Sequence, residues 1–392
     1  MVEVHTDTGK KLYLDPNLQI IFSVTLMAVL GVASLAPAFP AIAKELAVSE
    51  ASIGLLITVF TLPGVIMTPV LGVMADRYGR KRILIPSLML FGIAGVACGF
   101  ARDFDLLLIF RFFQGVGAAS LGSLNLTIIG DLYSGKERPA AMGYNASVLN
   151  VGTAIYPALG GALAMLGWYY PFFLPVVAIP IGLVVLFSLN NPEPRNEQSL
   201  KIYLNSTWKS IRNRQVLGLF IASIVTFIIL YGSYQTFFPI LIENTFNVSP
   251  IIIGLIMASM ALTTAITSSQ LGKLVKILPE KTLMRVSFIL YALALVSIPY
   301  VSDLTTLLIP TMVFGIAHGI NIPTIHTILA GLAPMEYRAA FMSVNGMVLR
   351  LGQTLGPLIM GTVFVLWGSD GVFYAGAGFA IGMVVVLMVL VK

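Results

Sequence analysis

Three ionisable side chains, Arg111, His318 and Arg350, lie deep inside long apolar stretches of the sequence. An arginine in such a stretch costs at least about 2.5–3.5 kcal/mol unless it finds a partner or water. Arg350, together with Arg111, therefore predicts a positively charged cavity that favours anionic or zwitterionic molecules. The alternative is that each guanidinium snorkels toward the surface or binds backbone carbonyls for structural reasons.

His318 is the candidate proton site of this group. Imidazole is the side chain most easily titrated between pH 5 and 8, and no Asp or Glu lies equally deep in an apolar stretch. Asp131, at the end of the stretch that contains Arg111, is the second candidate proton carrier. A histidine that merely hydrogen-bonds a neighbouring helix is the structural alternative.

Polar and aromatic residues at helical spacing extend this group. Each shares a helix face with one of the three ionisable residues, or lies on a helix that is expected beside them. They are Gln114, Asn125, Asn150, Tyr231, Tyr234, Gln235, Asn321 and Gln353. We expect these side chains to contact a substrate through hydrogen bonds and stacking, and plain helix packing is the alternative for the two tyrosines.

A second group of charges lies between Gly72 and Arg82, where five charges and two glycines separate two apolar runs. If this stretch joins two helices, Arg77 or Arg80 can reach Asp131 and form an ion-pair latch. The alternative is a static basic turn that only sets orientation in a membrane.

The elements that position these residues are predicted to be membrane helices. Apolar residues make up 57% of the 392 residues and charged ones 10%, whereas a soluble domain carries about 25% charged residues. A bilayer core needs about 20 apolar residues for each spanning helix. Twelve segments meet this need, and they fall near residues 18–40, 50–75, 83–101, 106–132, 139–166, 171–189, 216–240, 250–275, 283–301, 305–332, 339–366 and 371–391. The predicted fold is an all-α membrane protein.

Lysine and arginine positions predict the topology. With both termini in the cytoplasm, 19 of the 23 Lys and Arg residues fall in cytoplasmic segments, and only Lys44 and Arg102 fall outside. We therefore expect a multi-pass protein of the plasma or inner membrane, whose first apolar run is retained as a helix. The net charge of +6 reflects this orientation and requires no nucleic-acid partner. The lone Cys98 excludes an intrachain disulfide, and no metal or other cofactor is expected.

An internal repeat of 200 residues divides the chain. Between residues 131 and 161, a shift of 200 gives ten identities in 31 positions, among them Asn145 with Asn345 and Pro157 with Pro357. The prediction is two parallel six-helix bundles, residues 18–189 and 216–392, after a cytoplasmic tail of residues 1–17. The linker, residues 190–215, either contains a short amphipathic helix on the membrane surface or is simply solvated.

Parallel halves of this kind occur in alternating-access transporters, which bind substrate between the halves. Three motifs carry a family resemblance: Gly72-x3-Asp76-Arg77-x-Gly79-Arg80-Lys81, Arg111-x2-Gln114-Gly115-x-Gly117-Ala118-Ala119 and Gly152-x3-Tyr156-Pro157-x2-Gly160-Gly161. The first two resemble motifs of the major facilitator superfamily. The third is similar to the helix 5 motif of its 12-helix drug:proton antiporters.

The resemblance implies a cavity lined by helices 4, 5, 10 and 11, and an Asp76 that faces the start of helix 11, around residues 338–342. It also implies that the motif residues control gating. The expected gating residues are Gly72, Asp76, Arg77, Gly79, Arg80, Asp131, Gly152, Pro157, Gly160, Gly161, Gly356 and Pro357.

Efflux by proton antiport is the function that the resemblance implies, with a small amphipathic or anionic compound as substrate. Two departures from the family pattern matter. Tyr156 stands where the antiporter motif has glycine before proline, whereas helix 11 has the intact Gly356-Pro357, and Lys276 stands where the repeat of Asp76 would fall. Proton-coupled symport or facilitated uptake of an anionic metabolite therefore remains the alternative.

An enzyme is not expected, because the sequence has no embedded carboxylate pair, no His-Glu-x-x-His and no nucleotide-binding loop. The expected partners are a small-molecule substrate, protons and the lipid bilayer, and the protein is expected to be a monomer.

Overall fold

Helices make up almost all of the chain that the computed structural model describes, which is residues 12–191, 213–332 and 338–391, with side chains described from residue 344 in the last range. No strand occurs in these ranges, so the predicted all-α fold is confirmed. The amphipathic helix expected in the linker and most of the N-terminal tail lie outside the described residues.

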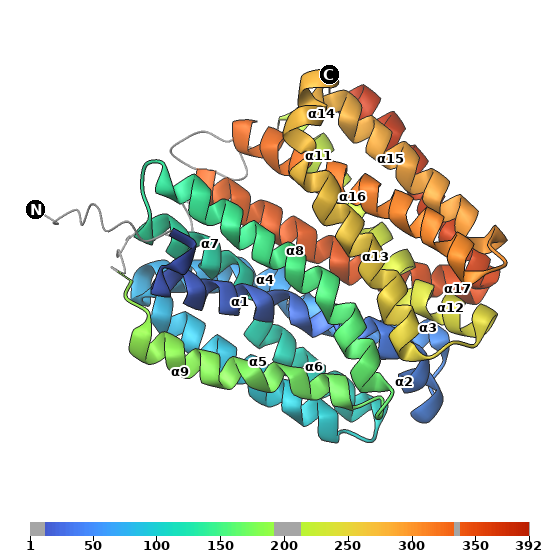
Figure 1. Cartoon of the computed structure of the whole chain (residues 1–392), viewed down its shortest axis with the longest axis horizontal. Coiled ribbons are helices and arrows are strands. Elements are labelled where there is room, and N and C mark those ends of the chain that lie inside the picture. The colour runs from blue at the N-terminus through green and yellow to red at the C-terminus, as the bar shows by residue number, and fades with distance from the viewer. Residues whose placement is uncertain (1–11, 192–212, 333–337, 392) are drawn as a thin grey trace, which may run out of the picture.

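The helices of the first half begin near residue 16 and end near residue 188 (Figure 1). They are α1 (Pro16–Ala33), α2 (Phe39–Glu45), α3 (Glu50–Ile53), α4 (Leu55–Tyr78), α5 (Arg80–Phe100), α6 (Phe104–Ala118), α7 (Leu121–Leu132), α8 (Glu137–Ala164) and α9 (Ala178–Ser188), with the short helices η2 (Ala36–Ala38) and η3 (Tyr170–Val177).

The second half begins at Arg214. Its helices are α11 (Arg214–Ile228), the π-helix η4 (Ile229–Phe237), α12 (Phe238–Phe246), α13 (Pro250–Ser269), α14 (Leu271–Ile277), α15 (Glu280–Ser297), η5 (Ile298–Tyr300), α16 (Leu304–Leu332) and α17 (Arg338–Leu390).

Eleven helical stretches in the described residues are long and apolar enough to cross a membrane. The last of them, Val344–Leu390, contains Gly368 with φ 69° and ψ −168°. A positive φ of this kind suits glycine and breaks the helix. When α17 is divided at Gly368, the twelve expected spans are accounted for.

Three spans are irregular near the predicted site. Pro37 and Pro40 accompany the break between α1 and α2, as expected for residues that cannot donate a backbone hydrogen bond. The span with Arg111 breaks between α6 and α7, and α11 widens into the π-helix η4. π-Helical segments often occur at functional sites, and η4 contains Tyr231, Tyr234 and Gln235.

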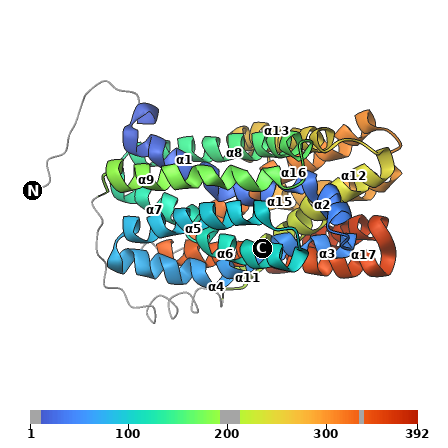
Figure 2. The same cartoon turned by 90° about the horizontal axis from the view of Figure 1, so that it is seen from below.

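The helices pack first within each half and then across the middle. In the first half α1 packs on α8, and α6 packs on α4 and α5; in the second, α11 packs on α17, and α16 packs on α13 and α15. The two halves meet along α8 with α13 and along α4 with α17. Figure 1 shows the two groups of helices converging toward α2, α3 and α12, and Figure 2 shows these three helices gathered at the same end.

We call this end, with α2, α3 and α12, the closed end. Glycines there allow the backbones of the two halves to touch: a Cβ on Gly161 would lie 2.3 Å from the Pro250 carbonyl oxygen, and one on Gly254 would lie 2.2 Å from the Pro157 carbonyl oxygen. A hydrogen bond of 3.0 Å from Asn244 to Glu50 also joins the halves at this end. The halves are therefore in backbone contact here.

We call the opposite end, where α4 meets α5 at Gly79, the basic end. A Cβ added to Gly72, Gly143, Gly272 or Gly346 would meet nothing within 4 Å, although these glycines lie in helices from both halves. Each described hydrogen bond between the halves lies at the closed end or near the middle, as in the 2.9 Å contact of Thr61 with Thr354. Over the described residues, the molecule is closed at one end and open at the basic end.

Gly161→Ala tests whether this contact holds the closed end shut. The added methyl would overlap the Pro250 carbonyl, so we expect the variant to shift the population away from this conformation. In a Cys98→Ala background, a cysteine at buried Thr236 beside Gly54 should then react several-fold faster with a water-soluble thiol reagent. Gly143→Ala on the same helix is the matched control, and equal labelling rates in the two variants would contradict the expectation.

Candidate functional site

Arg350 lies on α17 where the two halves meet. Its side chain passes within about 3.1 Å of the position that a Cβ on Gly64 of α4 would occupy, and it interacts electrostatically with Tyr231 of η4. Its Nη1 atom donates a 3.1 Å hydrogen bond to the Gln353 Oε1 atom. The ion pairs found among the described residues do not include Arg350. A half-buried guanidinium without a carboxylate partner therefore faces the seam between the halves.

Tyr231 of η4 lies beside this guanidinium, with other aromatic and amide side chains on α11 and η4 nearby in the chain. Tyr231 is half-buried and stacks on Phe227 with ring centroids 5.8 Å apart. Gln235, one turn later, is also half-buried, and its Oε1 atom has no hydrogen-bond partner among the described residues. Arg350, Gln353 and Tyr231 are thus brought together, with Gln235 on the same helix as Tyr231.

Tyr234 is placed differently from the prediction. Its ring is 1% exposed and lies between Phe238 and Phe314, each with a centroid 4.8 Å away. In this conformation Tyr234 packs the interior of the second half, as the helix-packing alternative expects.

Arg111 does not face open space in this structure. It is 0% exposed, its Nε atom donates to the Leu56 carbonyl at 3.0 Å, and its Nη1 atom donates to the Gly31 carbonyl and the Gln114 side chain. Its guanidinium also covers the Phe60 ring at 4.2 Å. The prediction that Arg111 adds charge to a cavity is wrong for this conformation, because the side chain is buried inside the first half, where carbonyls near helix breaks accept from its Nε and Nη1 atoms. Its Nη2 atom is buried without a hydrogen-bond partner among the described residues.

Arg111→Lys tests this structural role. Lysine keeps the positive charge but lacks the planar guanidinium with its several N–H donors. It therefore leaves buried carbonyls without hydrogen-bond donors, and each unsatisfied carbonyl costs about 1–3 kcal/mol of stability. We expect purified Arg111→Lys to melt at a lower temperature, as followed by a thiol-reactive dye on buried Cys98. The exposed Arg102→Lys is the control. An unchanged melting temperature with loss of substrate binding would instead place Arg111 in the binding site.

The remaining predicted polar residues of the first half lie on α7 and α8. Asn125 is 1% exposed and donates to the Thr25 hydroxyl at 2.8 Å, and Thr25 donates to Asn145 at 2.6 Å. Asn150 is half-buried on α8. Asn125 therefore ties α7 to α1, whereas Asn150 is less enclosed.

His318 and Asn321 lie in the interior of the second half. The His318 Nδ1 atom and the Tyr291 hydroxyl are 2.6 Å apart, and Asn321 donates to the Thr226 hydroxyl at 2.6 Å. Asn321 is 0% exposed and His318 is half-buried. The structure thus gives His318 a bonded partner on α15.

The basic end contains the charged group of α4 and α5. Arg80 pairs with Asp76, and its Nε atom also lies 2.9 Å from an Asp131 carboxylate oxygen. Arg77 instead lies over the Tyr78 ring, so the ion-pair partner of Asp131 is Arg80. Gly79, with φ 108°, is the single residue between the two helices, and only glycine adopts this angle readily.

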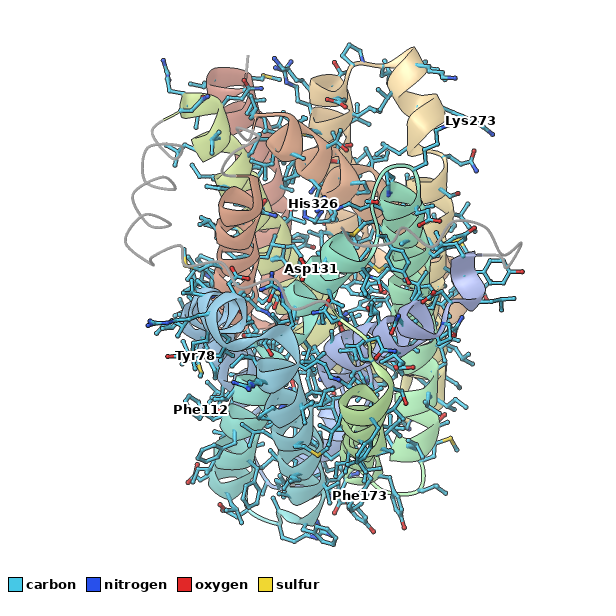
Figure 3. All side chains as sticks on the ribbon, turned by 90° about the vertical axis from the view of Figure 1, so that its left-hand side faces the viewer. Tyr78, Phe112, Asp131, Phe173, Lys273 and His326 are labelled. Carbon is cyan, nitrogen blue, oxygen red and sulfur yellow. The ribbon has the colours of Figure 1, made fainter. Side chains whose placement is uncertain are left out.

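The expected contact of Asp76 with residues 338–342 lies outside the described side chains. Figure 3 looks onto the basic end, and in this view Asp131 and His326 lie toward the middle of the molecule, while Tyr78 and Lys273 lie nearer its edges. Next to Asp131, burial and a 2.8 Å hydrogen bond to Asp15 raise the pKa of Tyr133, which therefore stays a neutral donor that ties α7 to the start of α1.

The other predicted gating residues line helix contacts. A Cβ on Gly160 would lie 1.8 Å from the Ser34 carbonyl oxygen, one on Gly356 would lie 2.9 Å from the Gly232 nitrogen, and one on Gly152 would lie 2.9 Å from Leu26. Pro157 and Pro357 contact Gly254 and Gly54 across the halves. Close helix packing accounts for these residues, and Gly72, which meets nothing, lies within α4 and not in a turn.

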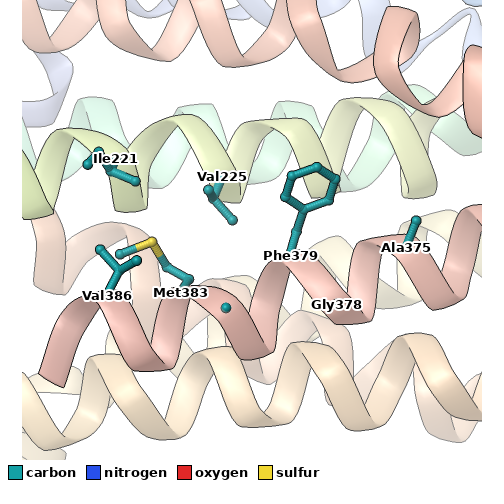
Figure 4. A pocket seen from close by; sticks show the side chains of 8 residues that line it. Ile221, Val225, Ala375, Gly378, Phe379, Met383 and Val386 are labelled. Carbon is teal, nitrogen blue, oxygen red and sulfur yellow. The ribbon is translucent and has the colours of Figure 1, made fainter. Parts of the chain in front are cut away.

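Two hollows in the described residues lie away from these groups. One, of about 470 Å³, lies between α11 and α17 and is lined by apolar side chains such as Ile221, Phe379 and Met383 (Figure 4). The other, of about 370 Å³, is lined mainly by Ile, Leu and Thr of α13 and α16. Neither contains a charged residue that could orient an ionic substrate.

Several residues of these networks were missed from the sequence. Tyr291 and Thr226 gave no signal, because each is an ordinary residue in an apolar helix. Asn145 and Asn345 did give a signal in the sequence, because they are identical across the repeat, and both side chains are buried in the structure.

Comparison with known proteins agrees with this architecture. A family profile described as Major Facilitator Superfamily matches residues 21–244 and 224–392. Multidrug resistance protein 1 of Bacillus subtilis (strain 168) is 26% identical over 371 residues, which is 94% of each chain. Quinolone resistance protein NorA of Staphylococcus aureus (strain COL) is 22% identical over 96% of this chain and 97% of that protein.

Among solved structures, that of the nucleoside transporter NupG superposes with a TM-score of 0.82 at 16% identity and covers 96% of this chain and 100% of that one. This likeness shows the fold, and the profile spans nearly the whole length of the chain. The protein is a multi-pass membrane protein that belongs to the Major Facilitator Superfamily.

Proposed function

We propose that the protein is a secondary active transporter that exports a small anionic or amphipathic compound in exchange for protons. The relatives named for multidrug and quinolone resistance align over almost the full length of both chains. Their names support efflux, and the two halves that meet at one end support alternating access.

The observation that carries the proposal is Arg350. A guanidinium at membrane depth needs a counter-charge, backbone carbonyls or water. None of the described carboxylates pairs with Arg350, and its described hydrogen bond goes to the Gln353 side chain. Its planar fork suits a carboxylate or phosphate, and the stacked rings of Tyr231 and Phe227 beside it suit a flat apolar body. A substrate with an acidic group on an aromatic ring fits both features.

The closed end and the basic end would serve as the two gates of the transporter. We place the basic end in the cytoplasm, because the lysine and arginine excess lies there. The described conformation then accepts substrate from the cytoplasm, and separation of α8 from α13 at the closed end would release it outside. In this scheme Asp76 stabilises the opposite conformation by reaching the start of α17, in addition to its ion pair with Arg80 that is already formed here, and His318 carries the exchanged proton.

Transport in proteoliposomes with an imposed pH gradient tests the proposal. A quinolone, which has a carboxylate on a planar ring, is the anionic probe, and ethidium, a planar cation, is the comparison. We expect the quinolone to move against its gradient only when protons flow the opposite way. Movement in the same direction as the protons would overturn antiport.

Uptake by symport is the second candidate, because one residue favours it. Tyr156 replaces the motif glycine before Pro157 and is 8% exposed in α8. If Tyr156→Gly converts proton-linked uptake into exchange in the same assay, symport is the native mode.

A further inference from the structure

A chain of polar side chains crosses the interior of the second half, apart from the seam at Arg350. It begins at His318 on α16, whose Nδ1 atom lies 2.6 Å from the Tyr291 hydroxyl of α15. Asn321, one turn further along α16, lies near the same hydroxyl, and its amide donates to Thr226 of α11 at 2.6 Å. Thr226 donates in turn to the Ala222 carbonyl at 2.8 Å.

Most of the polar side chains in this network are buried inside the second half. Tyr291, Asn321 and Thr226 are 0% exposed, whereas His318 is half-buried and so keeps an accessible edge. The Asn321 Oδ1 atom is buried without a hydrogen-bond partner among the described residues. A buried acceptor without a donor costs free energy comparable to a lost hydrogen bond, so this oxygen points to a second state in which it is used.

The charges around His318 are few. Tyr291 faces it from α15, Thr226 of α11 and Tyr234 of η4 face the same interior, and Thr264 and Thr267 of α13 pack against Gly319 beside it. Arg350 of α17 interacts with Tyr231 of η4 and not with the polar side chains around His318. No described Asp, Glu, Lys or Arg forms a hydrogen bond or ion pair with His318, so the proton on this ring is governed by neutral partners.

We propose that His318, Tyr291 and Asn321 form a two-state hydrogen-bond switch that binds one proton. In the neutral state the Tyr291 hydroxyl donates to the His318 Nδ1 atom, the ring carries its proton on Nε2, and the Asn321 Oδ1 atom is empty. In the charged state a proton from water adds to Nδ1, and this new N–H donates to the Tyr291 oxygen. The hydroxyl hydrogen then rotates to the Asn321 Oδ1 atom. One N–H bond forms as one O–H bond of a hydronium ion breaks, and the Asn321 Oδ1 atom gains a donor.

This switch also has a route to the substrate side. Asn321 holds Thr226 on α11, which leads directly into η4, and η4 carries Tyr231 beside Arg350. The inference rests on the proposed proton coupling at His318 and specifies how that site works. Tyr291 and Asn321 are positioning residues, and His318 is the group that holds the proton.

The switch is tested by nitrogen NMR of protein that carries 15N-labelled histidine in lipid nanodiscs. The chain has three histidines, so His318→Gln and His326→Gln assign the signals. Asn321→Leu removes an acceptor that only the protonated state uses. Tyr291→Phe removes the hydroxyl that donates to the neutral ring and accepts from the charged ring. Because charge-assisted hydrogen bonds are about twice as strong as neutral ones, we expect the titration midpoint of His318 to fall by about one pH unit, a tenfold loss of proton affinity.

Asn125→Leu is the matched control, since it removes the corresponding buried amide from α7 and should leave the midpoint unchanged. A midpoint that is the same in Tyr291→Phe, Asn321→Leu and the parent protein would overturn the switch. So would a neutral ring whose proton is on Nδ1, because the hydroxyl could not then donate to it.

Transport separates this inference from the proposed function. If the midpoint falls in Tyr291→Phe and the pH profile of proteoliposome transport moves with it, both stand. If the midpoint falls but transport by the parent protein does not respond to a pH gradient, the switch stands and proton coupling fails.

Discussion

Arg350→Gln should lower the transport of an anionic substrate at least tenfold while the amount of protein in the membrane stays the same. A hydrogen bond to a charged group contributes about 1.5–3 kcal/mol, which corresponds to a factor of about 10–150 in affinity. In this structure Gln353 is the one described side chain to which Arg350 donates, so the substitution leaves few protein groups unsatisfied. The loss should therefore appear mainly as a higher KM for the quinolone probe.

Two further variants make this result specific. Arg350→Lys keeps the charge without the planar fork and should recover only part of the affinity. Lys273→Gln, on α14 away from the seam, removes a positive charge from the same half and should transport normally (Figure 3). Unchanged quinolone transport by Arg350→Gln would show that the guanidinium has a structural role, like that of Arg111.

The fold could be predicted because its constraints are local. A span must be long and apolar, and backbone groups in a bilayer must bond within the helix. Both requirements can be read from short windows of sequence. The boundary inside α17 was placed correctly on either side of Gly368 for the same reason.

The site could be predicted only in part, because its chemistry depends on which helices touch. Arg111 and Arg350 give the same signal in sequence, yet Arg111 finds the Gly31 and Leu56 carbonyls whereas Arg350 finds a single amide. Whether a carbonyl is free depends on helix breaks and on neighbours far along the chain. Tyr291 illustrates the same limit, since its importance comes from its contact with His318.

Asp76→Asn is the variant that tests gating most directly. Arg80 has a side chain that is 7% exposed and contacts both Asp76 and Asp131, whose side chains are 45% and 14% exposed. When Asp76 is neutralised, Arg80 keeps its more buried partner, and an exposed ion pair contributes only about 0–1 kcal/mol. We therefore expect normal insertion and a thermal stability close to that of the parent protein.

Transport should nevertheless fall at least tenfold, because Asp76 is proposed to act in the conformation that is closed at the basic end. There it can accept hydrogen bonds at the start of α17, where a carboxylate is favoured by the helix dipole. Asp131→Asn provides the contrast: it strips Arg80 of its buried partner and should lower thermal stability as well as transport.

The repeat supplies a matched control for this prediction. Lys276 of α14 occupies the position of Asp76 in the second half, so the first half alone carries an acid there. Lys276→Gln should leave transport unchanged. If Asp76→Asn also transports normally, the basic end has no acid-dependent latch, and the ion pairs of Arg80 serve only to join α4, α5 and α7 within the first half.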